Sequence, residues 1–219
     1  MAGDGARRRT RAPARALEIG ERVFVRRPTA RDRDEFLALV RASRRLHRPW
    51  VAPPATPARF AAYLGRVRMP NRVGLLVCRR EDGAIVGVVN VSEIVRGALQ
   101  SAYLGYYGSA AHAGRGYLTE GLALVLRHAF RHLGLHRLEA NVQPGNRPSL
   151  ALVRRLGFRR EGFSPRYLKV RGRWRDHQRW AVLRENWRED WREDWRERGR
   201  EPGRVARRER RPARRGARP

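Results

Sequence analysis

Two glycines stand directly before a long apolar segment, in the run Ala111–Tyr117 (AHAGRGY). A helix that begins at Tyr117 leaves its first backbone N–H groups without intrahelical acceptors, and its dipole makes that end positive. Gly114 and Gly116 let the backbone come close to a bound group, so this turn predicts a site for an anion such as phosphate. The loop lacks the Gly-Lys-Ser/Thr of a nucleotide P-loop and the full dinucleotide fingerprint. Taken alone, it is equally compatible with a plain packing turn.

A second polar pair stands at the start of a later helix. Asn146 and Ser149 are three residues apart, and the apolar periodicity that follows ends at Leu156 and Gly157. Ser149 could therefore face the same cleft as the glycine loop. Asn146 is also a residue type that caps helices, and for this pair alone the capping role is the preferred interpretation.

The elements that must position these residues follow from hydrophobic periodicity and turn residues. Asp82-Gly83 predicts a hairpin, and Gly134 lies where a helix C-cap is expected. We predict helices over 30–45, 58–68, 117–133 and 147–156, and strands over 21–27, 72–79, 84–93, 101–107, 137–142, 158–169 and 174–185. The fold class is α/β (α+β), with a mixed, mostly antiparallel sheet of about seven strands and about four helices on its faces.

Charge divides the 219 residues into three parts. The formal charge of the whole chain is +29. Residues 1–16 hold five Arg and one Asp, and residues 196–219 hold eleven Arg and three Glu. We predict a disordered basic arm over 1–16, a folded domain over 17–186, and a tail over 187–219 that holds a Trp-Arg-Glu-Asp repeat and disordered basic sequence. The repeat is read as a helical extension resting on the domain or on a second copy, in preference to an RNA-stacking platform. Lys169 is the only lysine among 50 basic residues, which favours a compositional bias over a selected nucleic-acid surface.

Several classes of protein are excluded. Cys78 is the only cysteine, so there is no internal disulfide and no cysteine-based zinc cluster. No apolar run reaches the roughly 18–20 residues that cross a bilayer, and no apolar stretch follows the N-terminal arginines as in a secretory signal. The six histidines show no paired ligand spacing by this interpretation, so we expect no metal. We predict a cytoplasmic protein without a membrane contact, either a monomer or a homodimer.

Several spaced motifs together resemble the GNAT N-acetyltransferases, and within them the ribosomal-protein-alanine N-acetyltransferase (RimJ-like) branch. The resemblance covers about 19–187 and leaves out both basic ends. The segments that carry it are Val95–Gly97, Tyr103–Tyr106, Gly114–Tyr117 with Glu120, Asn146–Phe158 and Tyr167–His177.

The resemblance implies transfer of an acetyl group from acetyl-CoA, a co-substrate, to an amine. The pantetheine arm would pair with the strand of Leu104–Tyr106, which splays in a V from the strand of Glu139–Val142, and the diphosphate would rest on backbone N–H groups of 112–117. The residues it assigns to acetyl-CoA are Leu104, Gly105, Tyr106, His112, Ala113, Gly114, Arg115, Gly116, Tyr117, Asn141, Asn146 and Ser149. Ala111 stands where the family usually has Gln or Arg, so weaker anchoring is expected, with Arg115 as partial compensation.

Catalysis needs little from the protein if the acceptor is an α-amine, whose pKa of ~7.7–8.0 leaves a substantial fraction of it neutral at cytoplasmic pH. By the resemblance, Ser149 lies near the sulfur and could hydrogen-bond or protonate the departing thiolate. An N–H of the Leu104–Tyr106 strand could stabilise the oxyanion. Glu93, at a strand end, is the candidate base acting through water, although a solvated strand-end carboxylate is the preferred interpretation. Glu120 is interpreted as structural.

Three functions remain open from the sequence. The leading one is acetylation of a protein N-terminal α-amine of the ribosomal-protein-alanine type, with the Arg-rich ends contacting the ribosome or RNA. The second keeps the fold but acetylates a small-molecule amine. The third is a nucleic-acid-binding or ribosome-binding protein with a degenerate acetyltransferase domain, favoured by Ala111 and opposed by the intact Gly114, Gly116, Asn146 and Ser149.

Overall fold

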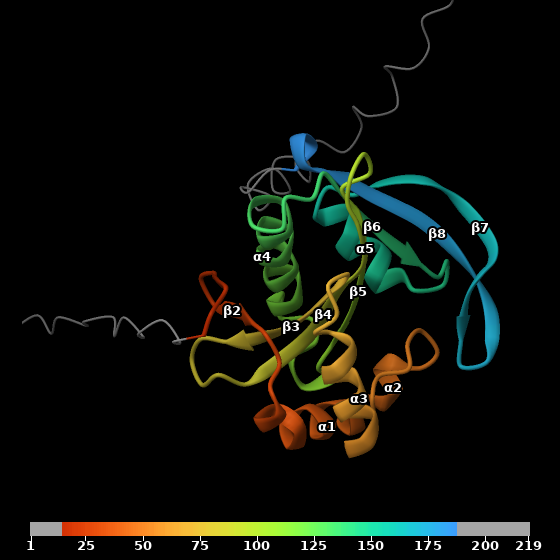
Figure 1. Cartoon of the computed structure of the whole chain (residues 1–219). Coiled ribbons are helices and arrows are strands. Elements are labelled where there is room, and N and C mark those ends of the chain that lie inside the picture. Colours follow the sequence, from red (N-terminus) through yellow and green to blue (C-terminus); the bar gives the residue numbers. More distant parts are fainter. Residues whose placement is uncertain (1–14, 188–219) are drawn as a thin grey trace, which may run out of the picture.

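The computed structural model describes residues 15–187. Strands rich in apolar residues form one mixed sheet with helices on both faces (Figure 1). The strands are β1 (Glu18–Ile19), β2 (Val23–Arg26), β3 (Arg72–Arg79), β4 (Ile85–Val95), β5 (Ser101–Gly108), β6 (Arg137–Val142), β7 (Arg159–Val170) and β8 (Arg173–Leu183). The α-helices are α1 (Arg33–Ala42), α2 (Arg44–His47), α3 (Pro57–Arg66), α4 (Tyr117–Arg131) and α5 (Arg147–Arg155).

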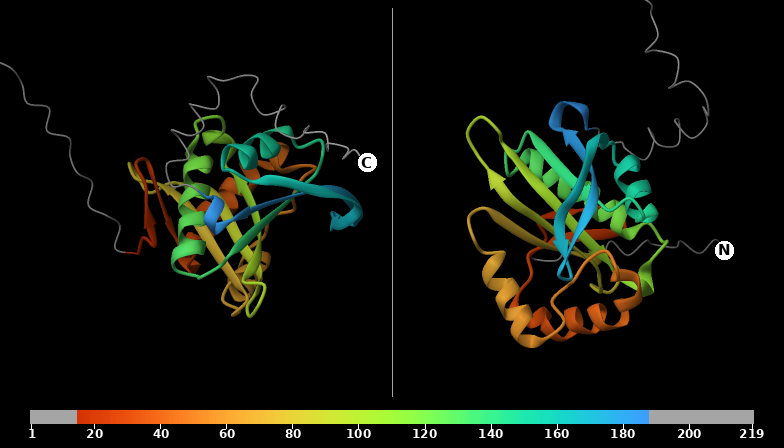
Figure 2. Two further views of the ribbon diagram at one scale, coloured as in Figure 1. Left: turned by 90° about the horizontal axis from the view of Figure 1, so that it is seen from above. Right: turned by 90° about the vertical axis from the view of Figure 1, so that its right-hand side faces the viewer.

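The sheet has the order β1-β2-β3-β4-β5-β6-β8-β7. Neighbours from β1 to β5 are antiparallel, β5 and β6 are parallel, and β8 lies antiparallel between β6 and β7. The last two strands form a long twisted hairpin that extends away from the body of the molecule (Figures 1 and 2). The mixed, mostly antiparallel sheet that the sequence predicts is confirmed.

Strand β3 contributes side chains to two hydrophobic clusters, one on each face of the sheet. Val73, Leu75 and Val77 belong to the cluster formed with α4, whereas Leu76 and Cys78 belong to the cluster formed with α1 and α3. Because successive strand side chains point to opposite faces, a continuous apolar run is what a strand covered on both sides requires. The two helical layers on either side of the sheet are visible in Figure 2.

Two features of the fold differ from the prediction. The sheet has an eighth strand, β1, which has only two residues and is too short for a period-2 signal. The helix predicted over 30–45 is divided into a 3-10 turn, α1 and α2, with Ser43 at a non-helical ψ of 11° between the α-helices. The Ser43 hydroxyl oxygen accepts a 2.9 Å bond from the N–H of Ala110, a tertiary contact that local periodicity does not encode.

The C-terminal repeat is described only at its first residue. Trp187 packs against the α4 side of the core, with its ring centroid 5.7 Å from that of Phe130. Trp191 and Trp195 lie outside the described residues, as do the two basic ends. Among the residues that the structure describes, no helix combines the length and apolarity needed to cross a bilayer.

Candidate active site

Strands β5 and β6 separate partway along their length. They pair only where Ser101–Tyr103 meets Arg137–Glu139, while β5 continues to Gly108 and β6 to Val142. On its other edge β5 stays paired with β4 as far as Gly108. The edge of β5 from Leu104 onward therefore faces a gap between strands, which is the V-shaped opening expected from the resemblance.

The glycine loop lies at the end of this edge and carries free donors. Gly114 and Gly116 have φ of +73° and +78°, in the left-handed region that favours glycine. The N–H groups of His112 and Ala113 are used within the turn that precedes them. Those of Gly114, Arg115 and Gly116 have no protein acceptor within 15–187. The first helical bond of α4 runs from the Glu120 N–H to the Gly116 carbonyl at 3.1 Å, so three donors stand beside the positive end of a 15-residue helix.

Arg22 holds this loop in place. Its Nε lies 3.0 Å from Glu120 Oε2, its Nη1 donates to the Arg115 carbonyl at 3.1 Å, and its guanidinium carbon lies 5.0 Å from the Tyr117 ring centroid. Glu120 also accepts the Arg22 backbone N–H at 2.8 Å and is 4% exposed. The structural interpretation of Glu120 is confirmed. Arg22 was missed because its partners are more than 90 residues away along the chain.

A cavity of about 290 Å³ opens next to the loop. It joins the end of β5, the glycine loop, the start of α5 and the segment after α2. The predicted cofactor residues that line it are Tyr106, His112, Ala113, Gly114, Gly116, Asn146 and Ser149. Seven of the predicted residues thus converge on one space, although they come from three separate segments of sequence.

The other predicted cofactor residues lie around this cavity and do not line it. Leu104 is buried in the core, Gly105 is exposed on β5, and the Arg115 side chain is exposed. Tyr117 is half-buried beneath Arg22. Asn141, on β6, is half-buried, and its Oδ1 is an enclosed acceptor without a donor among the described residues.

Ser149 and Tyr106 form a hydrogen-bonded pair at the cavity wall. The Ser149 Oγ donates to the Tyr106 Oη at 2.8 Å, and the Asn146 Oδ1 accepts the Ser149 N–H at 3.3 Å. The capping role of Asn146 is therefore confirmed. Burial raises the pKa of Tyr106 to about 12, so its phenol stays protonated at neutral pH. The pair can hold a proton beside whatever group enters the cavity.

Glu93 is not brought to this cavity. Its carboxylate is ion-paired with Arg72 and accepts a bond from Asn71 Nδ2 at 3.4 Å, and its side chain is 48% exposed. The structure thus fits an exposed, ion-paired carboxylate better than a catalytic base, and Glu93 lies inside β4, not at the strand end that the sequence predicts. Its φ of +51° places it in a β-bulge of β4, where the pairing with β5 shifts register.

His47 and Trp50 are two of the cavity residues that the sequence does not predict. His47 Nε2 lies 2.8 Å from the Gly108 carbonyl, and burial lowers the pKa of His47, so the ring is neutral at pH 7. Trp50 follows in the proline-rich loop, and its carbonyl accepts from Gln143 Nε2 at 3.1 Å. His47 is the last residue of α2 and Trp50 lies in the proline-rich loop that follows, and only the fold brings the two beside β5 and α5.

The prediction that the histidines show no paired ligand spacing is wrong. His128 and His132 are four residues apart on α4, and a ring nitrogen of each lies near the carboxylate of Glu18 on β1. Residues four apart share a helix face, so this spacing was present in the sequence and was overlooked.

The proposed role of the glycine loop, called the glycine cradle below, predicts the effect of a substitution at Gly116. Gly116→Ala places a Cβ at φ +78°, 3.2 Å from Arg22 Nη2, and should distort the donors of the loop. We expect the KM for acetyl-CoA to rise about tenfold, which corresponds to about 1.4 kcal/mol of binding. Gly83→Ala is the matched control, since Gly83 has the same φ of +78° in the β3–β4 turn. It should lower stability without changing KM, and equal KM values for the two variants would contradict the assignment of the loop.

Comparison with known proteins agrees with this geometry. Residues 22–159 match the family described as Acetyltransferase (GNAT) domain. The chain is 38% identical over 125 residues to the probable N-acetyltransferase YjcK of Bacillus subtilis, covering 57% of this chain and 69% of that protein. It is 38% identical over 107 residues to the [Ribosomal protein uS5]-alanine N-acetyltransferase of Escherichia coli, covering 49% of this chain and 55% of that protein.

A solved structure shows the same fold with a related ligand. Mycobacterium smegmatis RimJ, in complex with CoA-disulfide, superimposes with a TM-score of 0.69 at 31% identity, covering 74% of this chain and 82% of that one. The splayed β5–β6 pair, the glycine cradle and the family match over 22–159 lead to one conclusion. The chain belongs to the GNAT acetyltransferase family, and its similarity is to the ribosomal-protein-alanine N-acetyltransferase branch.

Proposed function

We propose that this enzyme transfers the acetyl group of acetyl-CoA to the α-amine of a protein N-terminus, with a ribosomal protein as the substrate class. The observation that carries the proposal is the set of three N–H groups, at Gly114, Arg115 and Gly116, that have no acceptor within residues 15–187 and adjoin the open edge of β5. These donors suit a diphosphate, and the edge suits a pantetheine amide. The names of the relatives support the acceptor class.

In the proposed reaction, acetyl-CoA supplies the thioester carbonyl that the amine attacks. The amine nitrogen forms the new C–N bond, the C–S bond breaks, and the proton of the amine goes to water. An N–H on the open edge of β5 stabilises the oxyanion. The Ser149–Tyr106 pair donates a proton to the departing thiolate. The proton released by the amine then returns to the pair through water, which restores the hydrogen bond from Ser149 Oγ to Tyr106 Oη. Holding both reactants in the gap provides much of the remaining rate.

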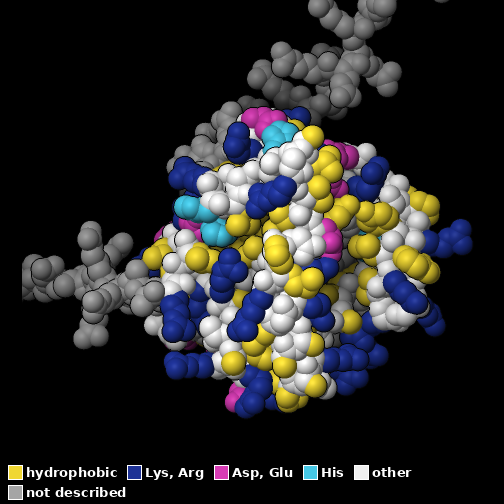
Figure 3. Space-filling view, in the orientation of Figure 1, with side chains coloured by type: hydrophobic (Ala, Val, Ile, Leu, Met, Phe, Trp, Pro, Cys, Tyr) yellow, Lys and Arg dark blue, Asp and Glu magenta, His cyan; other side chains and the backbone are white. Residues whose placement is uncertain are grey.

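The charge of the enzyme surface affects how a basic protein substrate would approach the site. On the face shown in Figure 3, basic side chains are spread over the whole surface and acidic ones are few. Such a field repels a basic protein at long range. Ribosomal RNA could offset that repulsion if the Arg-rich segments 1–16 and 196–219 contact it, and we include this contact and a cytoplasmic location in the proposal. Acetyl-CoA and ribosomes are both present in that compartment.

A peptide panel with the full chain tests the acceptor. Release of the CoA thiol is measured with a peptide beginning in Ala, the same peptide with a blocked N-terminus but a free lysine, and a polyamine. We expect turnover with the free α-amine to exceed the others by about 100-fold, since a lysine of pKa ~10.4 is mostly protonated at pH 7.5. Preferred turnover of the blocked peptide or the polyamine would overturn the proposal.

A further inference from the structure

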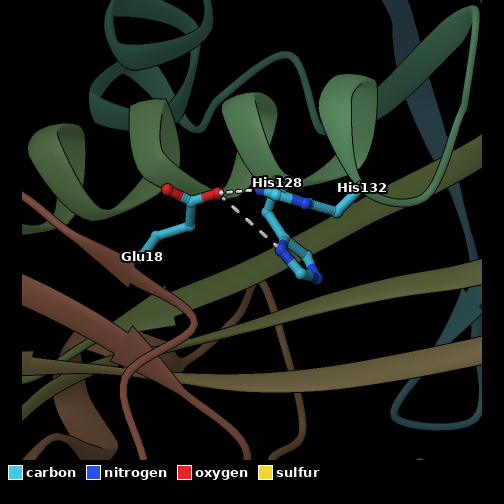
Figure 4. Close-up of side chains that lie close together, drawn as sticks. All are labelled: Glu18, His128 and His132. Atoms are coloured by element: carbon cyan, nitrogen blue, oxygen red, sulfur yellow. Dashed lines mark ion pairs between the residues drawn. The ribbon is translucent and has the colours of Figure 1, made fainter.

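A histidine–carboxylate cluster joins β1 to the C-terminal half of α4. Glu18 of β1 points toward His128 and His132 of α4, as Figure 4 shows. The Glu18 Oε1 lies 3.3 Å from His132 Nε2 and 3.8 Å from His128 Nδ1. The second oxygen, Oε2, is bound by Arg127 at 2.7 Å through Nε. One carboxylate oxygen is thus fixed by a guanidinium, and the other faces two imidazoles.

The cluster leaves buried polar atoms without partners. Glu18 and His128 are each 7% exposed. The Glu18 Oε1 and both ring nitrogens of His128 are enclosed and form no hydrogen bond with any described residue. A buried polar group without a partner destabilises the fold, so these atoms call for a ligand.

The separations match those between ligands of one small cation. Zinc bonds of about 2.0–2.1 Å in tetrahedral geometry place neighbouring ligand atoms about 3.4 Å apart. Two of the three separations are 3.3 and 3.8 Å, and all three ligand atoms lie within 4.8 Å of one another. His132 has a side chain that is 60% exposed, so its ring is free to turn and close the remaining distance.

Ligand type narrows the choice of ion. Two imidazoles and one carboxylate oxygen favour Zn²⁺ and its neighbours Co²⁺ and Ni²⁺, whereas Mg²⁺ and Ca²⁺ prefer oxygen ligands alone. The contact of Arg127 with Oε2 orients Glu18 in the way that outer-sphere partners orient metal ligands. Arg27 also acts electrostatically on His128, and these two positive charges weaken cation binding without occupying Oε1.

We propose that Glu18, His128 and His132 form a binding site for a transition-metal dication, with Zn²⁺ as the favoured ion. Three protein ligands leave a fourth position for water. The ion joins β1 to α4, the helix that begins directly after the glycine loop. Its role is structural. The site is independent of the acetyl-transfer chemistry and of its substrate.

Metal titration of the full, untagged chain tests this site. ZnCl₂ is titrated in a calorimeter and CoCl₂ is followed by its visible absorption, with no acetyl-CoA present. We expect one equivalent of either ion to bind, a tetrahedral Co²⁺ spectrum, and a rise in Tm with added Zn²⁺. His132→Gln should weaken binding at least about 30-fold, because even outer-sphere changes cost about 10–100-fold. All six histidines lie within the described residues, so the ends of the chain add no imidazole.

His136→Gln is the matched control. His136 pairs with Glu185 at 3.1 Å on the surface, and no third ligand-type residue joins that pair among the clusters of the described residues. This variant should bind Zn²⁺ as the unaltered chain does. His132 is exposed, so its variant should fold, and its melting curve without metal checks this. Absence of binding, or binding unchanged by His132→Gln, would overturn the proposal and leave Glu18 and His132 as an ion pair.

Discussion

Ser149→Ala is expected to lower kcat about 100-fold while leaving the KM for acetyl-CoA within about twofold. The alanine variant keeps the start of α5, because the cap bond of Asn146 goes to the backbone N–H of residue 149. It removes the Oγ that donates to Tyr106 at 2.8 Å, and with it the proposed proton donor to the thiolate. Positioned proton transfer contributes about 10²–10⁴-fold in enzymes. Steady-state release of the CoA thiol measures the effect.

Two further variants make the Ser149 prediction specific. Ser164→Ala, on β7 outside the cavity, is the control and should retain full activity. Tyr106→Phe should cost less than Ser149→Ala if serine is the immediate donor, because Ser149 keeps its own hydroxyl. A larger loss for Tyr106→Phe would transfer the donor role to the phenol. An unchanged kcat in both variants would contradict a proton role for the pair.

Gly121→Ala is expected to reduce the free energy of unfolding by about 3 kcal/mol, at the upper end of the cost of overpacking a core. Gly121 lies in α4 where the helix crosses β3, and an added Cβ would stand 2.3 Å from Val77 Cγ1 and 2.6 Å from Val77 Cγ2. Val77 is fully buried at the centre of the sheet, so it has no room to withdraw. Urea unfolding at equilibrium measures the change.

Gly65→Ala is the matched control for Gly121. It lies in α3, with nothing within 4 Å of an added Cβ. Alanine is favoured over glycine inside a helix by about 0.5–1 kcal/mol, so this variant should be slightly more stable than the parent. A Gly121→Ala protein that unfolds at the parent's urea midpoint would show that α4 and β3 are not packed as closely as described.

Much of the fold could be predicted from the sequence because turn residues mark its boundaries. Strands over 72–79 and 137–142 were predicted with the bounds that the structure shows, and helices were predicted to begin at Tyr117 and Arg147, where they do begin. Each boundary is marked locally, by the glycine loop before Tyr117 and by Asn146 before Arg147. The break at Ser43 was not predictable, since it depends on a contact with Ala110, 67 residues further along the chain.

The candidate site divides in the same way. The glycine loop and the cap at Asn146 are properties of short segments, so spacing alone predicts a turn and a helix start at these places. The assignment of the loop to acetyl-CoA comes only from the resemblance and stays a prediction. Arg22, His47 and Trp50 enter only through tertiary contacts, and a lone arginine in a chain with 50 basic residues gives no signal. Glu93 was chosen for its place at a strand end, but its pairing with Arg72 depends on the register of β3 and β4.

The cradle itself is tested most directly by a crystal structure of the full chain with acetyl-CoA bound. The diphosphate oxygens should lie within hydrogen-bond distance of the Gly114 and Gly116 N–H groups, and the thioester should lie in the gap between β5 and β6, beside Ser149. A diphosphate bound elsewhere, with the loop donors still unused and the strand gap filled by side chains, would contradict the account.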